Sequence, residues 1–212
     1  MNRLALALLA AVSLAQPSQA AGPMETTNLA LHTLTIRTYA VHEHDELSSA
    51  TLTLASSLLG AAGVGSRWTS CGPAHADATC AQPLASMDLA IRLVHDSTNE
   101  PGRGPLPMGA SLVDTTRRTG SLATLYLDRI DRLATGSATS ADVILARAIA
   151  HEAAHLVLGT NEHGATGLMR PLWSRAMLRH GAASEWVFTE DEGRRLREAL
   201  AIRLVAVQRG GS

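Results

Sequence analysis

Hydrophobic and polar residues alternate in several short segments between residues 34 and 130. Alternation with a period of two is typical of strands that bury one face. The pattern predicts strands at residues 34–39, 66–69, 88–94, 110–114 and 123–130. Residues 99–107, rich in glycine and proline, predict a loop between the third and fourth of these strands.

Longer apolar segments predict helices. Residues 46–62 read as a helix that ends at Gly63, and residues 190–207 as an amphipathic helix. Residues 143–158 are almost unbroken apolar, which is typical of a buried helix, and residues 139–142 resemble a capping box at its start.

Two histidines in the long apolar segment are four residues apart. His151 and His155 therefore lie on the same face of the predicted helix, where two imidazoles form half of a zinc site. Glu152, one residue further on, is placed beside the open coordination position. The alternative is two core histidines at a chance spacing. Burying these groups unpaired costs roughly several kcal/mol, and a metal ion would satisfy both imidazoles, so we favour the zinc site.

Residues that follow this helix can complete the site. Gly159 stands where a helix C-terminus favours a residue that tolerates positive φ. After a short turn, His163 can return to the metal as a third ligand, with a solvated loop histidine as the alternative. Met169 in the turn 167–171 is predicted to be buried, either beneath the metal or in the ordinary core.

His-Glu-x-x-His followed by glycine, a third histidine and a methionine turn resembles the metzincin metallopeptidases. Residues 150–163 and 167–170 are similar to segments of small secreted bacterial metzincin-like proteins, and residues 188–192 resemble the start of their last helix. The likeness is sharp between residues 150 and 173. It implies an α+β fold in which a mixed β-sheet packs on an active-site helix and a C-terminal helix follows.

The spacing departs from the usual metzincin pattern, which places the glycine three and the last histidine six residues after the second histidine. Here Gly159 and His163 lie four and eight residues after His155, and Asn161, a poor zinc ligand, occupies the usual third position. We predict that His151, His155 and His163 bind Zn²⁺. The carboxylates that stay open as third ligands are Glu162, Glu185, Glu190 and Glu192.

The resemblance implies a zinc-dependent endopeptidase. Glu152 would act as general base on a zinc-bound water and pass the proton to the leaving amine. A peptide or protein substrate would bind beside an edge strand, for which residues 123–127 are the candidate. A catalytically inactive zinc-binding protein of peptidase ancestry and a hydrolase of non-peptide amides are the alternatives. Glu152 favours an enzyme, because metal binding alone needs no carboxylate at that position.

The first residues have the features of a bacterial signal peptide. A short basic start precedes an apolar segment at 4–15, which is too short to span a membrane, and small residues lead to Ala20. We predict cleavage of residues 1–20, secretion to the periplasm or medium, and no stable membrane insertion afterwards. Residues 21–31 would form a linker and residues 32–209 a single metallopeptidase-like domain. A retained N-terminal anchor is the alternative.

Cys71 and Cys80 are the only cysteines. Two cysteines this close in an exported protein usually pair, and closing so small a loop contributes about 2–3 kcal/mol. The alternative is a thiol that binds the metal and inhibits the enzyme, against which the nearby second cysteine argues.

Composition adds little to the chemistry. The formal net charge is −1, so nothing favours nucleic acid or an anionic membrane as a partner. Aromatic residues make up 3% of the chain, so the core must be mainly aliphatic. Residues 42–45 (His-Glu-His-Asp) read as a solvated turn rather than a metal site, and neither His75 nor His95 has a partner at a useful spacing.

Overall fold

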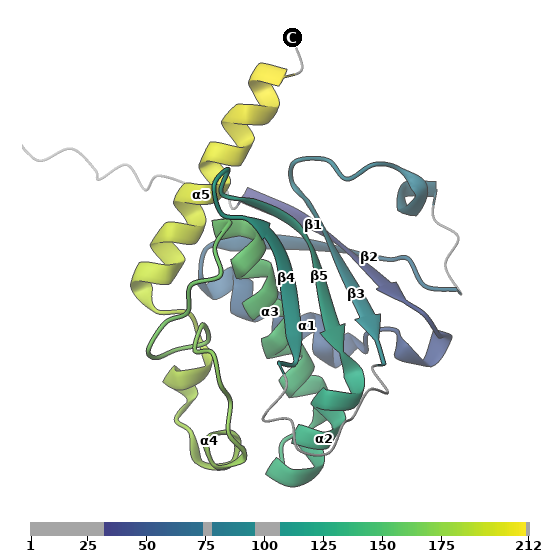
Figure 1. Cartoon of the computed structure of the whole chain (residues 1–212), viewed down its shortest axis with the longest axis vertical. Coiled ribbons are helices and arrows are strands. Elements are labelled where there is room, and N and C mark those ends of the chain that lie inside the picture. The colour runs from purple at the N-terminus through teal and green to yellow at the C-terminus, as the bar shows by residue number, and fades with distance from the viewer. Residues whose placement is uncertain (1–31, 74–77, 96–106, 211–212) are drawn as a thin grey trace, which may run out of the picture. The chain divides into compact units, whose positions relative to one another are not determined.

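The computed structural model describes residues 32–73, 78–95 and 107–210, and Leu31–Ser212 forms one compact unit. The predicted signal peptide and linker lie outside the described residues, as does most of the loop predicted at residues 99–107. The described part of the unit contains one mixed sheet and five α-helices (Figure 1).

The sheet has the strand order β2-β1-β3-β5-β4. Its strands are β1 (His32–Ala40), β2 (Val64–Ser70), β3 (Asp88–Val94), β4 (Gly109–Asp114) and β5 (Thr119–Tyr126). The pairs within β2-β1-β3-β5 are parallel, and β4 is antiparallel to β5. Each strand predicted from the alternating pattern is therefore present.

The helices are α1 (Ser49–Ala61), α2 (Leu127–Ser137), α3 (Ala141–Leu158), α4 (Arg175–His180) and α5 (Glu190–Gly210). Three short 3₁₀ turns also occur, η1 (Glu43–Asp45), η2 (Ala78–Ala81) and η3 (Ala183–Trp186). The three helices predicted from the sequence correspond to α1, α3 and α5.

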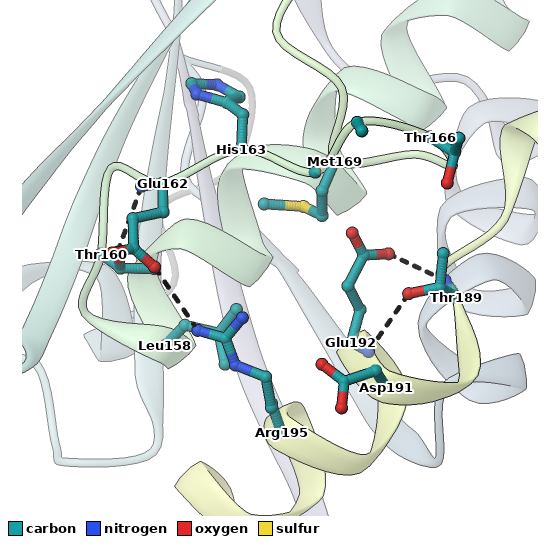
Figure 2. A pocket seen from close by; sticks show the side chains of 12 residues that line it. Leu158, Thr160, Glu162, His163, Thr166, Met169, Thr189, Asp191, Glu192 and Arg195 are labelled. Carbon is teal, nitrogen blue, oxygen red and sulfur yellow. Dashed lines mark hydrogen bonds and ion pairs between the residues drawn. The ribbon is translucent and has the colours of Figure 1, made fainter.

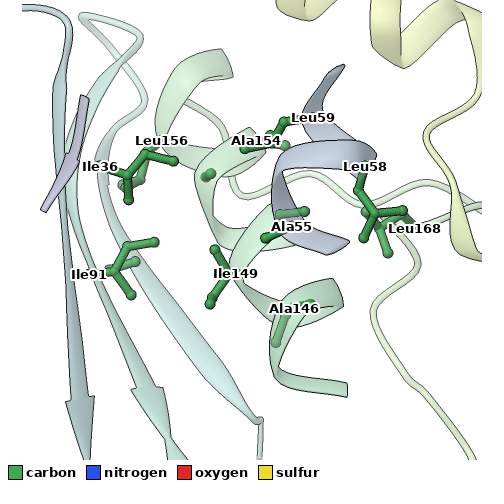
Figure 3. Packing of buried hydrophobic residues seen from close by; sticks show 14 of the residues in the cluster. Ile36, Ala55, Leu58, Leu59, Ile91, Ala146, Ile149, Ala154, Leu156 and Leu168 are labelled. Carbon is green, nitrogen blue, oxygen red and sulfur yellow. The ribbon is translucent and has the colours of Figure 1, made fainter. Parts of the chain in front are cut away.

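Helix α3 packs between the sheet and α1 (Figure 3). Ile36 and Ile91 of the sheet face Ile149 of α3, and all three side chains are fully buried. Ala55 and Ala154, also fully buried, lie where α1 meets α3. Small residues let two helices approach closely. Helix α3 is therefore packed against the sheet on one side and α1 on the other, which makes it a rigid support for the side chains on its remaining face.

The prediction of a strand over residues 123–130 is wrong at its end. Strand β5 stops at Tyr126 and α2 begins at Leu127. Leu127 and Ile130 are both buried, and their separation of three residues is the spacing of one helix face, with charged residues between them. Leu127 continues the alternation of Ala123 and Leu125, but Ile130 fits only the helical spacing.

The prediction that residues 123–127 form the sheet edge is also wrong. Strand β5 lies inside the sheet, between β3 and β4. Strand β4 forms that edge because the chain turns back through residues 115–118, so that the earlier strand is outermost. The outward-facing Leu112 of β4 is exposed.

Polar side chains fix the start of α3. The predicted capping box is wrong in detail: Ser140, not Thr139, is the N-cap and accepts a hydrogen bond from the Val143 N–H. Asp142 instead accepts hydrogen bonds from Ser48 and Thr51 at the start of α1, at 2.7 and 2.8 Å. The two core helices are thereby joined at their N-terminal ends.

The loop segment 78–83 lies against Arg37 on the other face of β1. Cys71 and Cys80 form a disulfide, as expected for an oxidising compartment. Arg37 of β1 is buried, pairs with Asp88 and donates hydrogen bonds to the carbonyls of Thr79 and Gln82. Because Arg37 alternates with Leu34 and Ile36, the polar face of β1 organises this loop while its apolar face joins the core.

Candidate metal centre

His151 and His155 lie one helical turn apart on α3 and converge. Their Nε2 atoms are 3.0 Å apart, and the residues are 8% and 4% exposed. Helix α3 ends at Leu158, and Gly159 caps it with φ of 59°. A side chain at residue 159 would also collide with the backbone of Arg118, so both the turn and the close approach require glycine.

The turn after Gly159 brings His163 to the same point. Its Nε2 atom lies 3.3 Å from that of His155. Among the described residues, the potential ligand atoms that meet here belong to His151, His155 and His163, which lie within 4.8 Å of one another. The longer spacing in this sequence therefore still brings a third imidazole to the pair.

Two backbone carbonyls orient the buried imidazoles. His151 Nδ1 is 2.9 Å from the Leu168 carbonyl, and His155 Nδ1 is 2.8 Å from the Thr160 carbonyl. A carbonyl only accepts, so each Nδ1 must carry the hydrogen, and a neutral ring then has a lone pair at Nε2. The 3.0 Å contact between these Nε2 atoms is therefore a meeting of two acceptors rather than a hydrogen bond.

Burial favours the neutral form of the His151 and His155 rings. It lowers the pKa of His151 to about 4, and it also lowers the pKa of His155 and of His163. Neutral imidazoles are the form that binds a transition metal. Two nitrogen lone pairs that face one another at 3.0 Å repel. A cation bound between the two nitrogens would remove this repulsion, because both lone pairs would coordinate it.

Glu152 follows His151 on α3 and lies against β4. Ser111 Oγ is 2.7 Å from the Glu152 carboxylate and donates to it. Burial raises the pKa of Glu152 to about 7, whereas the Ser111 hydrogen bond acts to lower it. Gly109 leaves room for this carboxylate, because a Cβ there would lie 2.6 Å from Glu152 Oε1.

Aromatic and methionine side chains surround the histidines. Met169 is buried in the turn between α3 and α4, and its carbonyl accepts a hydrogen bond from the Gly164 N–H. The Trp173 ring meets the His151 ring edge to face at 5.9 Å and is braced by Trp186 at 5.5 Å. The hydrogen bond between Gly164 and Met169 thus ties the segment that carries His163 to the methionine turn.

A pocket of about 240 Å³ lies next to His163, between the methionine turn and the start of α5. Figure 2 shows His163, Met169 and Glu192 around it, with Arg195 reaching toward Glu162. A smaller cavity of about 70 Å³ is lined by His151, Glu152, His163 and Trp173. His163 borders both spaces, and His151 borders the smaller one.

The carboxylates considered as alternative ligands have other contacts or face solvent. Glu192 accepts a hydrogen bond from the Thr189 N–H at 2.8 Å and caps α5. Glu185 lies 3.6 Å from Arg170, and Glu162 is largely exposed beside Arg195. Glu190 and Asn161 are exposed, and neither belongs to the ligand group.

Several contributors to the site were not foreseen from the sequence. They are Ser111 and Gly109 beside the carboxylate, the carbonyls of Thr160 and Leu168, and the Trp173 ring. A backbone carbonyl leaves no signal in residue identity. Ser111 and Gly109 belong to a strand whose place next to α3 depends on the strand order.

Comparison with known proteins bears on the fold. The sequence matches no protein-family model and no curated protein. Among solved structures, it is similar to the archaemetzincin of Methanopyrus kandleri, with a TM-score of 0.51 and 15% identity over 82% of this chain and 97% of that chain. The chain has a metzincin-like fold.

The predicted fold class is therefore confirmed: a mixed sheet packs on α3, and a C-terminal helix follows. At 15% identity this metzincin-like likeness concerns the fold.

Proposed function

We propose that the chain is a zinc-dependent metallopeptidase in which His151, His155 and His163 hold Zn²⁺. The convergence of three Nε2 atoms carries this proposal, because two of the rings have Nδ1 committed to carbonyls and so present lone pairs at 3.0 Å. Ligand nitrogens around tetrahedral zinc lie roughly 3.3 Å apart, given Zn–N bonds of about 2.0–2.1 Å. The three imidazoles fit that ion.

Glu152 supports an enzyme rather than a metal store. A zinc ion held here supplies an acidified water and a Lewis acid for a carbonyl. The Glu152 carboxylate would accept a proton from that water and return it to the leaving amine. Ser111 donates a hydrogen bond to that carboxylate, which lines the smaller cavity together with His151.

The proposed substrate is a peptide or protein that lies along β4. This strand is at the sheet edge, and Gly109 and Ser111 place it directly against Glu152. An extended peptide that pairs with an edge strand gains backbone hydrogen bonds without a sequence requirement. A peptide on β4 would thus bring one of its amide bonds close to the base.

Export completes the proposal. No helix in the described part of the chain is long and apolar enough to cross a membrane. The Cys71–Cys80 disulfide is consistent with an extracellular or periplasmic protein, and residues 1–20 have the signal-like pattern described above. We therefore propose a secreted or periplasmic protein of the small bacterial metzincin-like type.

Zinc removal and two matched variants test this function. Chelation should abolish hydrolysis of a mixed peptide library by the wild type, and added zinc should restore it. His163→Ala should lose most of the zinc and the activity, whereas Asn161→Ala should keep both. Loss of zinc in Asn161→Ala but not in His163→Ala would instead identify Asn161, at the usual metzincin spacing, as the third ligand. Full zinc without any cleavage would contradict the peptidase and favour a zinc-binding protein.

A further inference from the structure

A second group of possible metal ligands lies where β1 and β3 end. His44 and Asp45 belong to η1, and His95 directly follows β3. His95 Nε2 is 2.9 Å from Asp45 Oδ1, and His44 Nε2 is 3.4 Å from the same oxygen. The sequence offers His95 no partner at a useful spacing, and the fold supplies one 50 residues away.

Asp45 is the residue that points to a ligand. Its side chain is only 4% exposed, yet its Oδ2 atom is buried and has no hydrogen-bond partner in the described part of the chain. Buried polar atoms are nearly always satisfied, and an unpaired carboxylate oxygen is costly. The contact with His95 accounts for Oδ1 alone.

A simple ion pair between Asp45 and His95 is the competing explanation. It leaves Oδ2 unsatisfied and gives no reason for His44 to converge on the same carboxylate. His95 donates a hydrogen bond to Asp45, and Asp128 and Asp131 on α2 add negative charge near it. Negative charge around these imidazoles favours a divalent cation between them.

We propose that His44, Asp45 and His95 form a second divalent-cation site of the zinc class. Their ligand atoms lie within 4.8 Å of one another, and two imidazoles with one carboxylate suit Zn²⁺. The site shares no residue with the His151 centre. Its ion would join the turn after β1 to the end of β3, so binding should stabilise the fold.

Zinc binding to the metal-free mature chain tests the proposal, with zinc chloride as the probe and elemental analysis after dialysis. The wild type should bind two equivalents, and His44→Ala and His95→Ala one each. His44 is 77% exposed, so its replacement should leave folding intact. The control His180→Ala changes an exposed histidine outside both groups and should retain two.

A His151→Ala background separates this site from the catalytic proposal. That variant should keep one equivalent and a zinc-dependent rise in melting temperature, and adding His44→Ala should remove both. Unchanged stoichiometry in His44→Ala and His95→Ala would overturn the second site. A single wild-type equivalent that is lost in His44→Ala but kept in His151→Ala would support the second site and contradict the proposed peptidase centre.

Discussion

Ser111 on the edge strand β4 donates a hydrogen bond to the Glu152 carboxylate on α3, with 2.7 Å between Oγ and Oε2. The same hydroxyl lies 3.0 Å from the Glu152 carbonyl, so it meets both the side chain and the backbone of the proposed base. Strand β4 therefore has two roles: Gly109 lines the smaller cavity beside Glu152, and Ser111 orients the proposed base.

Replacing Ser111 by alanine should reduce kcat/KM at least about tenfold without changing zinc content. A hydrogen bond to a charged group contributes roughly 1.5–3 kcal/mol, and each 1.36 kcal/mol corresponds to about a tenfold change in rate. Ser111→Thr keeps the hydroxyl and should recover much of the rate. Ser121→Ala, an exposed serine of the adjacent strand, is the control. Wild-type rates in Ser111→Ala would remove this positioning role.

Arg37 should be essential for stability rather than for chemistry. Arg37→Met leaves the carboxylate of Asp88 without its buried partner and releases two loop carbonyls. Breaking a buried pair on one side typically costs about 3–5 kcal/mol, which urea unfolding of the oxidised chain would measure. Arg92→Met, at an exposed position of β3, should stay within about 0.5 kcal/mol. Equal losses of unfolding free energy in Arg37→Met and Arg92→Met would contradict a specific stabilising role for Arg37.

Asp142 should contribute stability that depends on pH. Hydrogen bonds from Ser48 and Thr51 lower its pKa, so the stabilisation is present above the unfolded-state pKa and disappears as pH falls through the folded-state pKa. Asp142→Ala should lower the free energy of unfolding by roughly 1 kcal/mol at neutral pH. The gap to wild type should begin to narrow below about pH 3.9 and close below the folded-state pKa. A gap that does not vary with pH would refute the carboxylate's role.

Local patterns predicted much of the fold and of the candidate site. Helix α3, its glycine cap and the facing histidines depend on spacings within one segment, which the sequence displays directly. Helix α2 was missed because Leu127 continues the alternation of the preceding strand.

Contacts between distant segments could not be predicted in the same way. The position of β4 at the sheet edge depends on the strand order. The contacts of Ser111 and Gly109 with Glu152 depend on it too, because both residues belong to β4. The contact between Asp45 and His95 depends on the parallel pairing of β1 with β3, which brings the ends of the two strands together. Such contacts follow from the packed topology and not from residue spacing.

Glu152→Gln tests the central claim most directly. The substitution keeps the size of the side chain and its capacity to accept a hydrogen bond from Ser111, but it removes the proton acceptor. Kcat/KM should be compared between wild type and Glu152→Gln at equal, measured zinc content, on a peptide that the wild type cleaves. We predict unchanged zinc and a loss of at least about a hundredfold, the usual contribution of general-base catalysis. Hydrolysis at the wild-type rate by zinc-loaded Glu152→Gln would contradict the account.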